Sequence, residues 1–196
     1  VQYKDSGFQI GYLQFETAGG IMNNRASNFF NENTFEQAVI ELLQGMGYTH
    51  IYAPDLNRED FSDPLMESAL IDCLVRINKK LPVEAIHEAI AKLRNFEGGS
   101  LVEKNKIFTG YLQNGVEVKY FYKGEERASI VYLIDYDKME NNTFYVVNQY
   151  TYIENGNNRR PDVILYINGL PLVLMELKSP SKDEVGAENA YNQIRN

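Results

Sequence analysis

Two apolar strands joined by an Asn-Gly pair constrain the fold of this chain more than any other feature. They lie within residues 161–178, on either side of Asn168-Gly169. Asn-Gly between two apolar runs is a strong signal for a β-hairpin, because both residues tolerate the positive φ angles of a tight turn. Residues 172–175 are apolar at every position, which is typical of a strand covered on both faces. The sequence therefore predicts a hairpin inside a layered sheet.

The remaining pattern predicts helices first and strands afterwards. Apolar residues at helical spacing indicate a helix from Asn33 or Thr34 to Gln44, one capped by Ser62 or Asp63 with Pro64 in its first turn, and one opened by Pro82. After Gly98-Gly99 the pattern alternates, predicting strands at 116–122, 129–134 and 144–152, and a final helix is expected from about Asp183. This order predicts an α+β (mixed α/β) fold with a central mixed sheet flanked by helices.

Length and composition favour one domain inside a cell. The 196 residues suffice for one domain with a core, and the single cysteine, Cys73, suits a reducing compartment. We find no signal-peptide pattern and no apolar run near the ~20 residues that span a bilayer, so we expect a cytoplasmic protein without membrane association. We divide the chain into an N-terminal extension, 1–31, and a domain, 32–196, with a helical region at about 62–97 packed on it.

Asp162, Glu176 and Lys178 are the candidate chemical residues. Two carboxylates and a backbone carbonyl, here that of Leu177, are enough for Mg²⁺, which prefers oxygen ligands and keeps several waters. Such an ion activates water and neutralises charge during phosphodiester hydrolysis. Glu176 and Lys178 are two apart on a strand and therefore share a face. Lys178 could orient the attacking water or stabilise negative charge beside the ion.

This site imposes a condition on the hairpin register. A strict two-residue turn with straight strands sets Asp162 opposite Met175, on the wrong face for Glu176. A shift of one residue sets Asp162 opposite Glu176. We therefore predict a bulged or three-residue turn with Gly169 left-handed, or a bend at Asp162.

Simpler interpretations stand beside these. A Glu-x-Lys pair on a strand is commonly a solvated face. A net charge of −8 does not suggest a free-standing nucleic-acid binder, although a cation would offset part of it and another part of a larger protein could hold DNA. His50, His87 and Cys73 match no metal or triad spacing, and we expect the histidines to be structural or exposed and Cys73 to be a small core residue. The tyrosines of the strands fit sheet packing.

The hairpin resembles a known family when it is read as one string. Arg159-Arg160-Pro161-Asp162, an apolar strand, Asn-Gly-Leu-Pro at 168–171 and a second strand ending in Glu176-Leu177-Lys178 resemble the nuclease domain of type I restriction enzyme R subunits. Upstream, Glu36, the Asn114-Gly115-Val116 turn and Asn148-Gln149 also fit. The resemblance implies a PD-(D/E)XK restriction-endonuclease-like fold, with Asp162 and Glu176 as ligands of Mg²⁺ (or Mn²⁺) and Lys178 as the catalytic lysine.

The resemblance also implies roles for residues outside this set. Glu36 is similar to a first-helix glutamate that completes such sites, a helix-surface role being the alternative, and Glu32 is a weaker candidate. Gln193 fits the start of a Gln-x-x-x-Tyr motif whose tyrosine falls beyond residue 196. Arg159 and Arg160 fit either a solvated turn or contacts to the DNA backbone, and Lys182 is a further candidate for such contacts.

The family implies a DNA-cleaving assembly as the context. The substrate would be double-stranded DNA, and the partners would be methylation and specificity subunits. The sequence has no Gly-x-x-x-x-Gly-Lys-Ser/Thr loop, so ATP binding is expected in a motor region outside these residues. The alternatives are a stand-alone repair nuclease of the same class and a non-catalytic docking module that uses residues 50–110 as its contact face.

Overall fold

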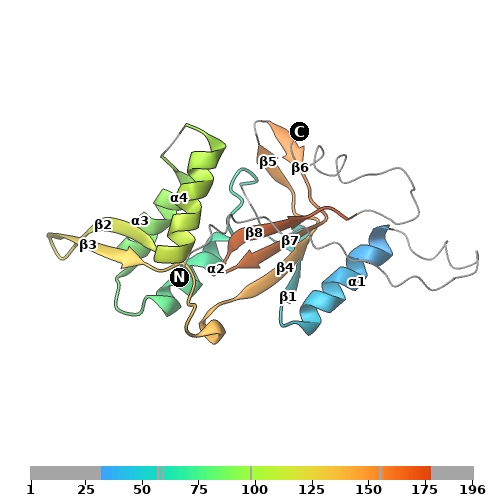
Figure 1. Ribbon diagram of the computed structural model, residues 1–196, viewed down its shortest axis with the longest axis horizontal. Coiled ribbons are helices and arrows are strands. Elements are labelled where there is room, and N and C mark those ends of the chain that lie inside the picture. Colours follow the sequence, from blue (N-terminus) through green and yellow to red (C-terminus); the bar gives the residue numbers. More distant parts are fainter. Residues whose placement is uncertain (1–31, 57, 59, 98, 155, 178–196) are drawn as a thin grey trace, which may run out of the picture.

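A four-stranded mixed sheet forms the centre of the molecule. The computed structural model describes residues 32–177 except 57, 59, 98 and 155. The strands follow the order β1-β4-β7-β8 (Figure 1). β1 runs parallel to β4, whereas the β4–β7 and β7–β8 pairs are antiparallel. The strand bounds are Thr49–Tyr52 (β1), Phe144–Asn148 (β4), Val163–Ile167 (β7) and Leu170–Met175 (β8).

Helices and two small hairpins surround this sheet. α1 (Glu32–Gly45) lies along one side, and α2 (Glu67–Ile77), α3 (Val83–Arg94) and α4 (Leu101–Asn114) gather towards the other with the long hairpin β2 (Val116–Tyr122) and β3 (Glu125–Val131) (Figure 1). A second hairpin joins β5 (Tyr152–Glu154) and β6 (Asn157–Arg159), and two 3₁₀ turns cover Ala53–Asp55 and Met139–Asn141. The fold is mixed α+β with helices flanking a mixed central sheet, as the sequence predicts.

Each face of the sheet carries a buried cluster, but β8 at its edge is only partly covered, because Val173 and Leu174 are 43% and 40% exposed. The prediction that residues 172–175 form a strand covered on both faces is therefore wrong. On one face Ile40 and Leu43 of α1 pack on alternate strand residues. On the other face the segment after β1 packs on the remaining strand residues, and Tyr150 and Tyr166 are completely buried there, as the prediction of sheet-packing tyrosines requires. The first face comprises Val146, Val163, Leu165, Met175 and Leu177, and the second comprises Val147, Ile164 and Tyr166.

The Asn168-Gly169 turn connects the sheet to a second core. This core is formed by α2, α3 and the β2–β3 hairpin, and Leu170 belongs to it. The Gly169 carbonyl accepts the backbone N–H of Met66 at 3.0 Å. Gly169 has φ +84°, and a Cβ there would lie 2.7 Å from the Met66 carbonyl oxygen and 2.8 Å from the Leu70 nitrogen. Only glycine fits this turn against the start of α2.

The prediction that Ser62 or Asp63 caps α2 is wrong. The helix begins at Glu67, and Met66 precedes it without a side-chain cap. Asp63 instead accepts the Leu65 N–H at 3.0 Å through Oδ1 and binds Arg94 of α3 through Oδ2. Asp63 therefore stabilises the turn before α2, and the sequence pattern could not distinguish these two uses of the same side chain. The helices predicted from Asn33 or Thr34 and after Pro82 are present, and Cys73 is fully buried as predicted.

The structure contains the helix α4 at a place where the sequence analysis predicts a change to a strand pattern after Gly99. None of its residues is fully buried, so its apolar stripe is weak. Its start carries a reciprocal capping box, in which Ser100 Oγ accepts the Glu103 N–H at 3.2 Å and Glu103 Oε2 accepts the Ser100 N–H at 3.0 Å. A Ser-x-x-Glu sequence was the available signal for this helix.

The predicted strands also differ in extent. β3 starts directly after the Lys123-Gly124 turn rather than at Ser129. The strand predicted at 144–152 stops at Asn148, because Gln149 has φ +56° and leaves the ladder, and β5 follows separately. The N-terminal extension and the predicted final helix lie outside the described residues.

Candidate active site

The site residues lie at one end of the central sheet. The last paired row runs through Asn148 of β4, Val163 of β7 and Met175 of β8. The β7–β8 register continued by one step sets Asp162 opposite Glu176, whereas Gln149, after β4, has φ +56° and leaves the ladder. Three polar residues thus lie at one end of three neighbouring strands, with Gln149 just after β4, Asp162 just before β7 and Glu176 just after β8.

A β-bulge in β8 produces this alignment. The turn itself has two residues, with Asn168 at φ +55° and Gly169 at φ +84°, and Ile167 pairs with Leu170. The register then shifts by one residue, because Tyr166 pairs with Pro171 whereas Leu165 pairs with Val173. Leu172 is the extra residue. The predicted three-residue turn is therefore absent, but the register condition is met by a bulge one pair further along the strand.

The carboxylate of Asp162 is anchored to the neighbouring strand end. Its Oδ2 accepts the backbone N–H of Leu177 at 2.6 Å. Asp162, Glu176 and Leu177 are all half-buried. Met175 and Leu177 both pack under α1, so strand alternation directs Glu176 to the opposite face. Asp162, next to the α1-facing Val163, shares that face with Glu176.

Glu36 approaches the same end of the sheet from α1. Its Oε1 accepts Asn148 Nδ2 at 2.7 Å, and its Oε2 accepts Gln149 Nε2 at 3.4 Å. Asn148 pairs with Val163, which faces α1, so Glu36 reaches the sheet from the side opposite Asp162. Within the described part of the chain, no three His, Cys, Asp or Glu side chains form a group that could hold a metal ion. The structure thus brings Asp162 and Glu176 to the same end of the sheet, and Glu36 reaches that end from the α1 face.

The predicted basic residues are only partly described. Arg159 is half-buried at the end of β6, opposite Tyr152, and its buried Nε has no hydrogen-bond partner among the described residues. Arg160 is exposed. The side chain of Glu32 and all of Lys178, Lys182 and Gln193 lie outside the described residues.

The segment between β1 and α2 supports the site, and sequence patterns gave no account of it. Arg58 donates to the Thr151 carbonyl at 2.6 Å and to the Asp63 carbonyl at 3.2 Å. Its guanidinium carbon lies 3.9 Å from the centre of the Tyr150 ring. The Ile153 N–H also donates to the Phe61 carbonyl at 2.8 Å. These contacts fix the β5–β6 hairpin, which leads into Asp162.

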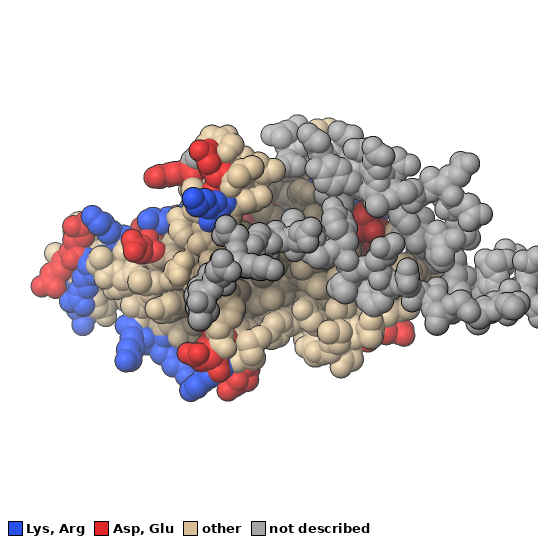
Figure 2. Space-filling model, viewed as in Figure 1, with Lys and Arg blue, Asp and Glu red and all other residues tan. Residues whose placement is uncertain are grey.

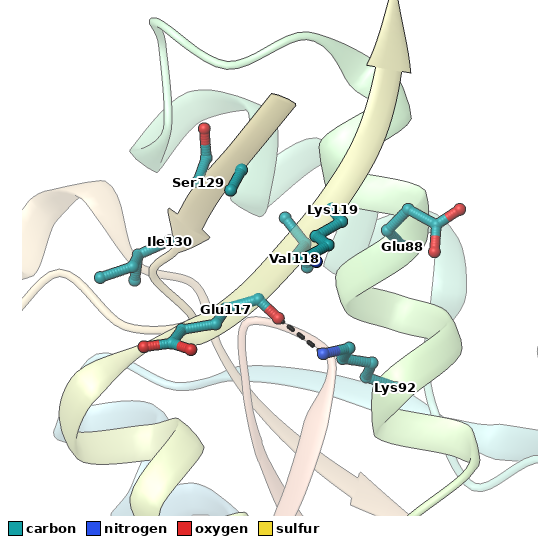
Figure 3. A pocket seen from close by; sticks show the side chains of 8 residues that line it. Glu88, Lys92, Glu117, Val118, Lys119, Ser129 and Ile130 are labelled. Carbon is teal, nitrogen blue, oxygen red and sulfur yellow. Dashed lines mark hydrogen bonds between the residues drawn. The ribbon is translucent and has the colours of Figure 1, made fainter. Parts of the chain in front are cut away.

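A groove lies apart from the candidate site, on the lobe formed by α2, α3, α4 and the β2–β3 hairpin. It lies between α3 and the β2–β3 hairpin, has a volume of about 610 Å³ and is lined by Glu88, Lys92, Glu117, Lys119 and Ser129 (Figure 3). Lys92 Nζ crosses it to the Glu117 carbonyl at 2.8 Å. In Figure 2 the Lys and Arg side chains visible on this lobe are interleaved with Asp and Glu. This arrangement gives no surface of a single charge on the face shown.

The fold and the site define a class of protein. A mixed sheet flanked by helices, with Pro161-Asp162 directly before one strand and Glu176 directly after the next, is consistent with a PD-(D/E)XK-like fold. The family described as type I restriction enzyme R protein N terminus matches residues 29–196. The chain belongs to this family.

Curated relatives support this assignment over most of the chain. The HindI type I restriction enzyme endonuclease subunit of Haemophilus influenzae is 34% identical over 84% of this chain and 16% of its own length. A protein of Methanocaldococcus jannaschii named as the MjaIXP endonuclease subunit is 31% identical over 89% of this chain and 17% of its own length. The EcoprrI endonuclease subunit of Escherichia coli is 28% identical over 85% and 49%, respectively. The chain thus spans about a sixth of the first two relatives. None of the described helices is long and apolar enough to cross a membrane.

Proposed function

We propose that this domain is a Mg²⁺-dependent endonuclease that hydrolyses phosphodiester bonds of double-stranded DNA within an ATP-dependent type I restriction complex. The register of β7 and β8, which sets Asp162 opposite Glu176 when it is continued one residue beyond the last pair, carries the proposal. It fulfils a condition that a metal site at these residues imposes and that a regular two-residue hairpin would violate. Relatives named as endonuclease subunits support it.

The residues at this end of the sheet fit a small divalent cation. Asp162 and Glu176 provide carboxylate oxygens from adjacent strands, and the carbonyl of Leu177 would provide a third oxygen, which is the donor set that Mg²⁺ prefers. Mn²⁺ suits the same ligands. A bound ion would supply an activated water and offset the negative charge that develops on the phosphate. The anchor from Leu177 to Asp162 holds one oxygen of that carboxylate and thereby orients the other.

Other residues receive roles around this pair. Lys178 would orient the attacking water or stabilise the developing charge, and Glu36 would act on water at the site's edge. Arg159 and Arg160 would bind DNA phosphates, since a guanidinium donates charge-assisted hydrogen bonds to phosphate oxygens. Lys182 and Gln193 are proposed as further DNA contacts.

The charge of the domain favours action within an assembly. A net charge of −8 opposes strong binding of the isolated chain to DNA. The partners proposed are the methylation and specificity subunits together with an ATP-dependent motor region. Choice of the DNA sequence would belong to the specificity subunit, so no base-reading residue is assigned here.

Metal binding by the whole chain tests the proposal. We would titrate Mn²⁺ and Mg²⁺ by calorimetry, with and without a short DNA duplex, into the wild type, Asp162→Asn and Glu176→Gln. Both substitutions keep the size of the side chain, and the Asn oxygen can still accept the Leu177 N–H. Glu126→Gln on the exposed face of β3 is the matched control. Loss of binding in both site variants but not in the control is expected.

Two results would count against the proposal. Unchanged binding in Asp162→Asn and Glu176→Gln would remove the metal site and leave a docking module as the better explanation. Absence of binding in the wild type, even with the duplex present to supply phosphate ligands, would have the same consequence. The role of Lys178 has a separate test. If the wild type cleaves plasmid DNA, Lys178→Ala should lose this cleavage.

A further inference from the structure

A hydrogen-bond chain connects three elements beside the candidate site. His50 of β1 lies with Nε2 at 2.9 Å from Asn148 Oδ1, and Asn148 Nδ2 lies 2.7 Å from Glu36 Oε1. His50 and Glu36 are half-buried, and Asn148 is 8% exposed. The chain therefore links β1 to α1 through the last residue of β4.

The chemistry of its members gives the chain one direction. An ionised carboxylate only accepts hydrogen bonds, so Asn148 must present its amide nitrogen to Glu36 and its oxygen to His50. His50 must then carry a proton on Nε2. A rotated Asn148 amide would set its oxygen against the Glu36 carboxylate and lose that bond, although the other tautomer of His50 could still accept from the amide nitrogen. The carboxylate thus sets the direction of the chain, and the bond from His50 holds the other end of the Asn148 amide in place.

Glu36 is held from two sides at the edge of the site. Gln149 Nε2 donates to its second oxygen at 3.4 Å, and Gln149 follows β4 directly, at the end of the sheet where Asp162 precedes β7 and Glu176 follows β8. Asn148 is the strand partner of Val163, which follows Asp162 in the chain. The Glu36 carboxylate is therefore held at the end of the sheet that carries the two candidate ligands, although within the described part of the chain it belongs to no three-residue metal group.

We propose that His50 is a positioning residue of the nuclease site, acting through Asn148 to fix the carboxylate of Glu36. This proposal rests on the proposed function, in which Glu36 acts on water at the site. Residues that orient such groups through hydrogen bonds affect metal affinity and activity without touching the reacting atoms. His50 matches no motif spacing, so a linear pattern gives no reason to select it.

Paired substitutions of His50 separate positioning from packing. Gln sets an N–H near the position of His Nε2, whereas Leu fills similar space without a donor. In the Mn²⁺ titration with duplex DNA, we expect His50→Leu to weaken affinity about tenfold, as for other orienting residues, and His50→Gln to restore most of it. Adding Glu36→Gln to His50→Leu should cause little further loss, because both act through one carboxylate. His87→Leu on the exposed face of α3 is the matched control.

A spectroscopic measurement tests the chain itself. In the ¹⁵N-labelled protein the neutral His50 ring should carry its proton on Nε2. Glu36→Gln should release this restriction, since a Gln can donate to Asn148 and let the Asn148 amide rotate. An Nδ1-protonated ring in the wild type would overturn the proposed direction.

The outcomes also distinguish the inference from the proposed function. If Asp162→Asn abolishes metal binding while His50→Leu matches the wild type, the nuclease site stands and the role of His50 is refuted. Equal loss in His50→Leu and His50→Gln, with lowered unfolding midpoints, would make His50 a packing residue only. If Asp162→Asn binds metal normally, the proposed function fails, and the role of His50 fails with it.

Discussion

Asp162 accepts the backbone N–H of Leu177 through Oδ2 at 2.6 Å, across the open ends of β7 and β8. The ladder itself ends one row earlier, at Val163 and Met175. The side chain of Asp162 thus replaces a ladder bond where the strands begin to separate. The same carboxylate is a candidate metal ligand, so Asp162 combines a structural bond with a chemical role.

These two roles are separable by substitution. Asp162→Ala leaves the Leu177 N–H without its acceptor and should lower the free energy of unfolding by about 2 kcal/mol, the usual cost of a half-buried donor left unpaired. Asp162→Asn retains an acceptor and should lose much less, while losing metal binding as fully as Asp162→Ala. Urea unfolding of both variants measures the first difference. Equal destabilisation by Asn and Ala would show that the Leu177 bond contributes little.

The turn glycines offer a matched pair of substitutions. Gly169 and Gly124 both have positive φ, at +84° and +80°, but a Cβ meets the backbone of α2 only at Gly169. Gly124→Ala should cost about 1 kcal/mol for the left-handed conformation. Gly169→Ala should cost clearly more, because the turn must also move away from Met66 and Leu70. Unfolding midpoints in urea compare the two, and similar losses would contradict the close packing of the turn on α2.

The hairpin core was predictable because local chemistry decides it. Asn168-Gly169 forms the expected turn, and β7 is buried on both faces, whereas Val173 and Leu174 of β8 are exposed. For the register, the sequence predicted only that a shift of one residue is needed to set Asp162 opposite Glu176, and not where this shift occurs. Whether the extra residue falls in the turn or at Leu172 depends on how Leu170 packs in the second core and how Gly169 meets α2, which are contacts between distant segments.

Contacts between distant segments also explain the residues that sequence reasoning missed. Arg58 acquires its role by reaching Thr151 and Tyr150, and His50 acquires its partner in Asn148, each more than ninety positions away in the chain. No periodicity or motif encodes such pairs. α4 is different, because its capping box at Ser100 and Glu103 is local and was readable. That helix was missed because its apolar stripe is weak, whereas Arg58 and His50 were missed because their roles depend on tertiary contacts.

Arg58 should contribute more to the free energy of unfolding than an exposed arginine does. Its hydrogen bond to Thr151 and its position over Tyr150 predict a loss of about 2 kcal/mol in Arg58→Ala. Arg58→Lys should restore little, because an ammonium cannot reproduce the planar stacking and the divergent donors. Arg127→Ala, at an exposed ion pair with Glu125, is the control and should change stability by less than about 1 kcal/mol. Full rescue by lysine would leave charge alone as the cause.

The two buried tyrosines predict a loss of stability at alkaline pH. Burial raises the pKa of Tyr166 far above its ordinary value of about 10, with a further contribution from Tyr150, and burial also raises the pKa of Tyr150. The unfolded chain therefore releases these protons at a lower pH than the folded chain. Their stabilising contribution is complete below about pH 10 and declines as the pH rises from there towards the folded-state pKa.

Tyr166→Phe isolates this contribution. The variant loses the hydrogen bond from the Tyr166 hydroxyl to the Pro64 carbonyl, at 3.0 Å, but that oxygen still lies 3.4 Å from the Tyr150 hydroxyl. We expect a modest loss of stability at about pH 8 and a smaller decline than in the wild type between about pH 10 and pH 11, where unfolded tyrosines ionise. Urea unfolding across this range measures both, and Tyr132→Phe, at an exposed position, is the control. An identical decline in Tyr166→Phe and the wild type would mean that Tyr166 ionises as readily in the fold as in the unfolded chain.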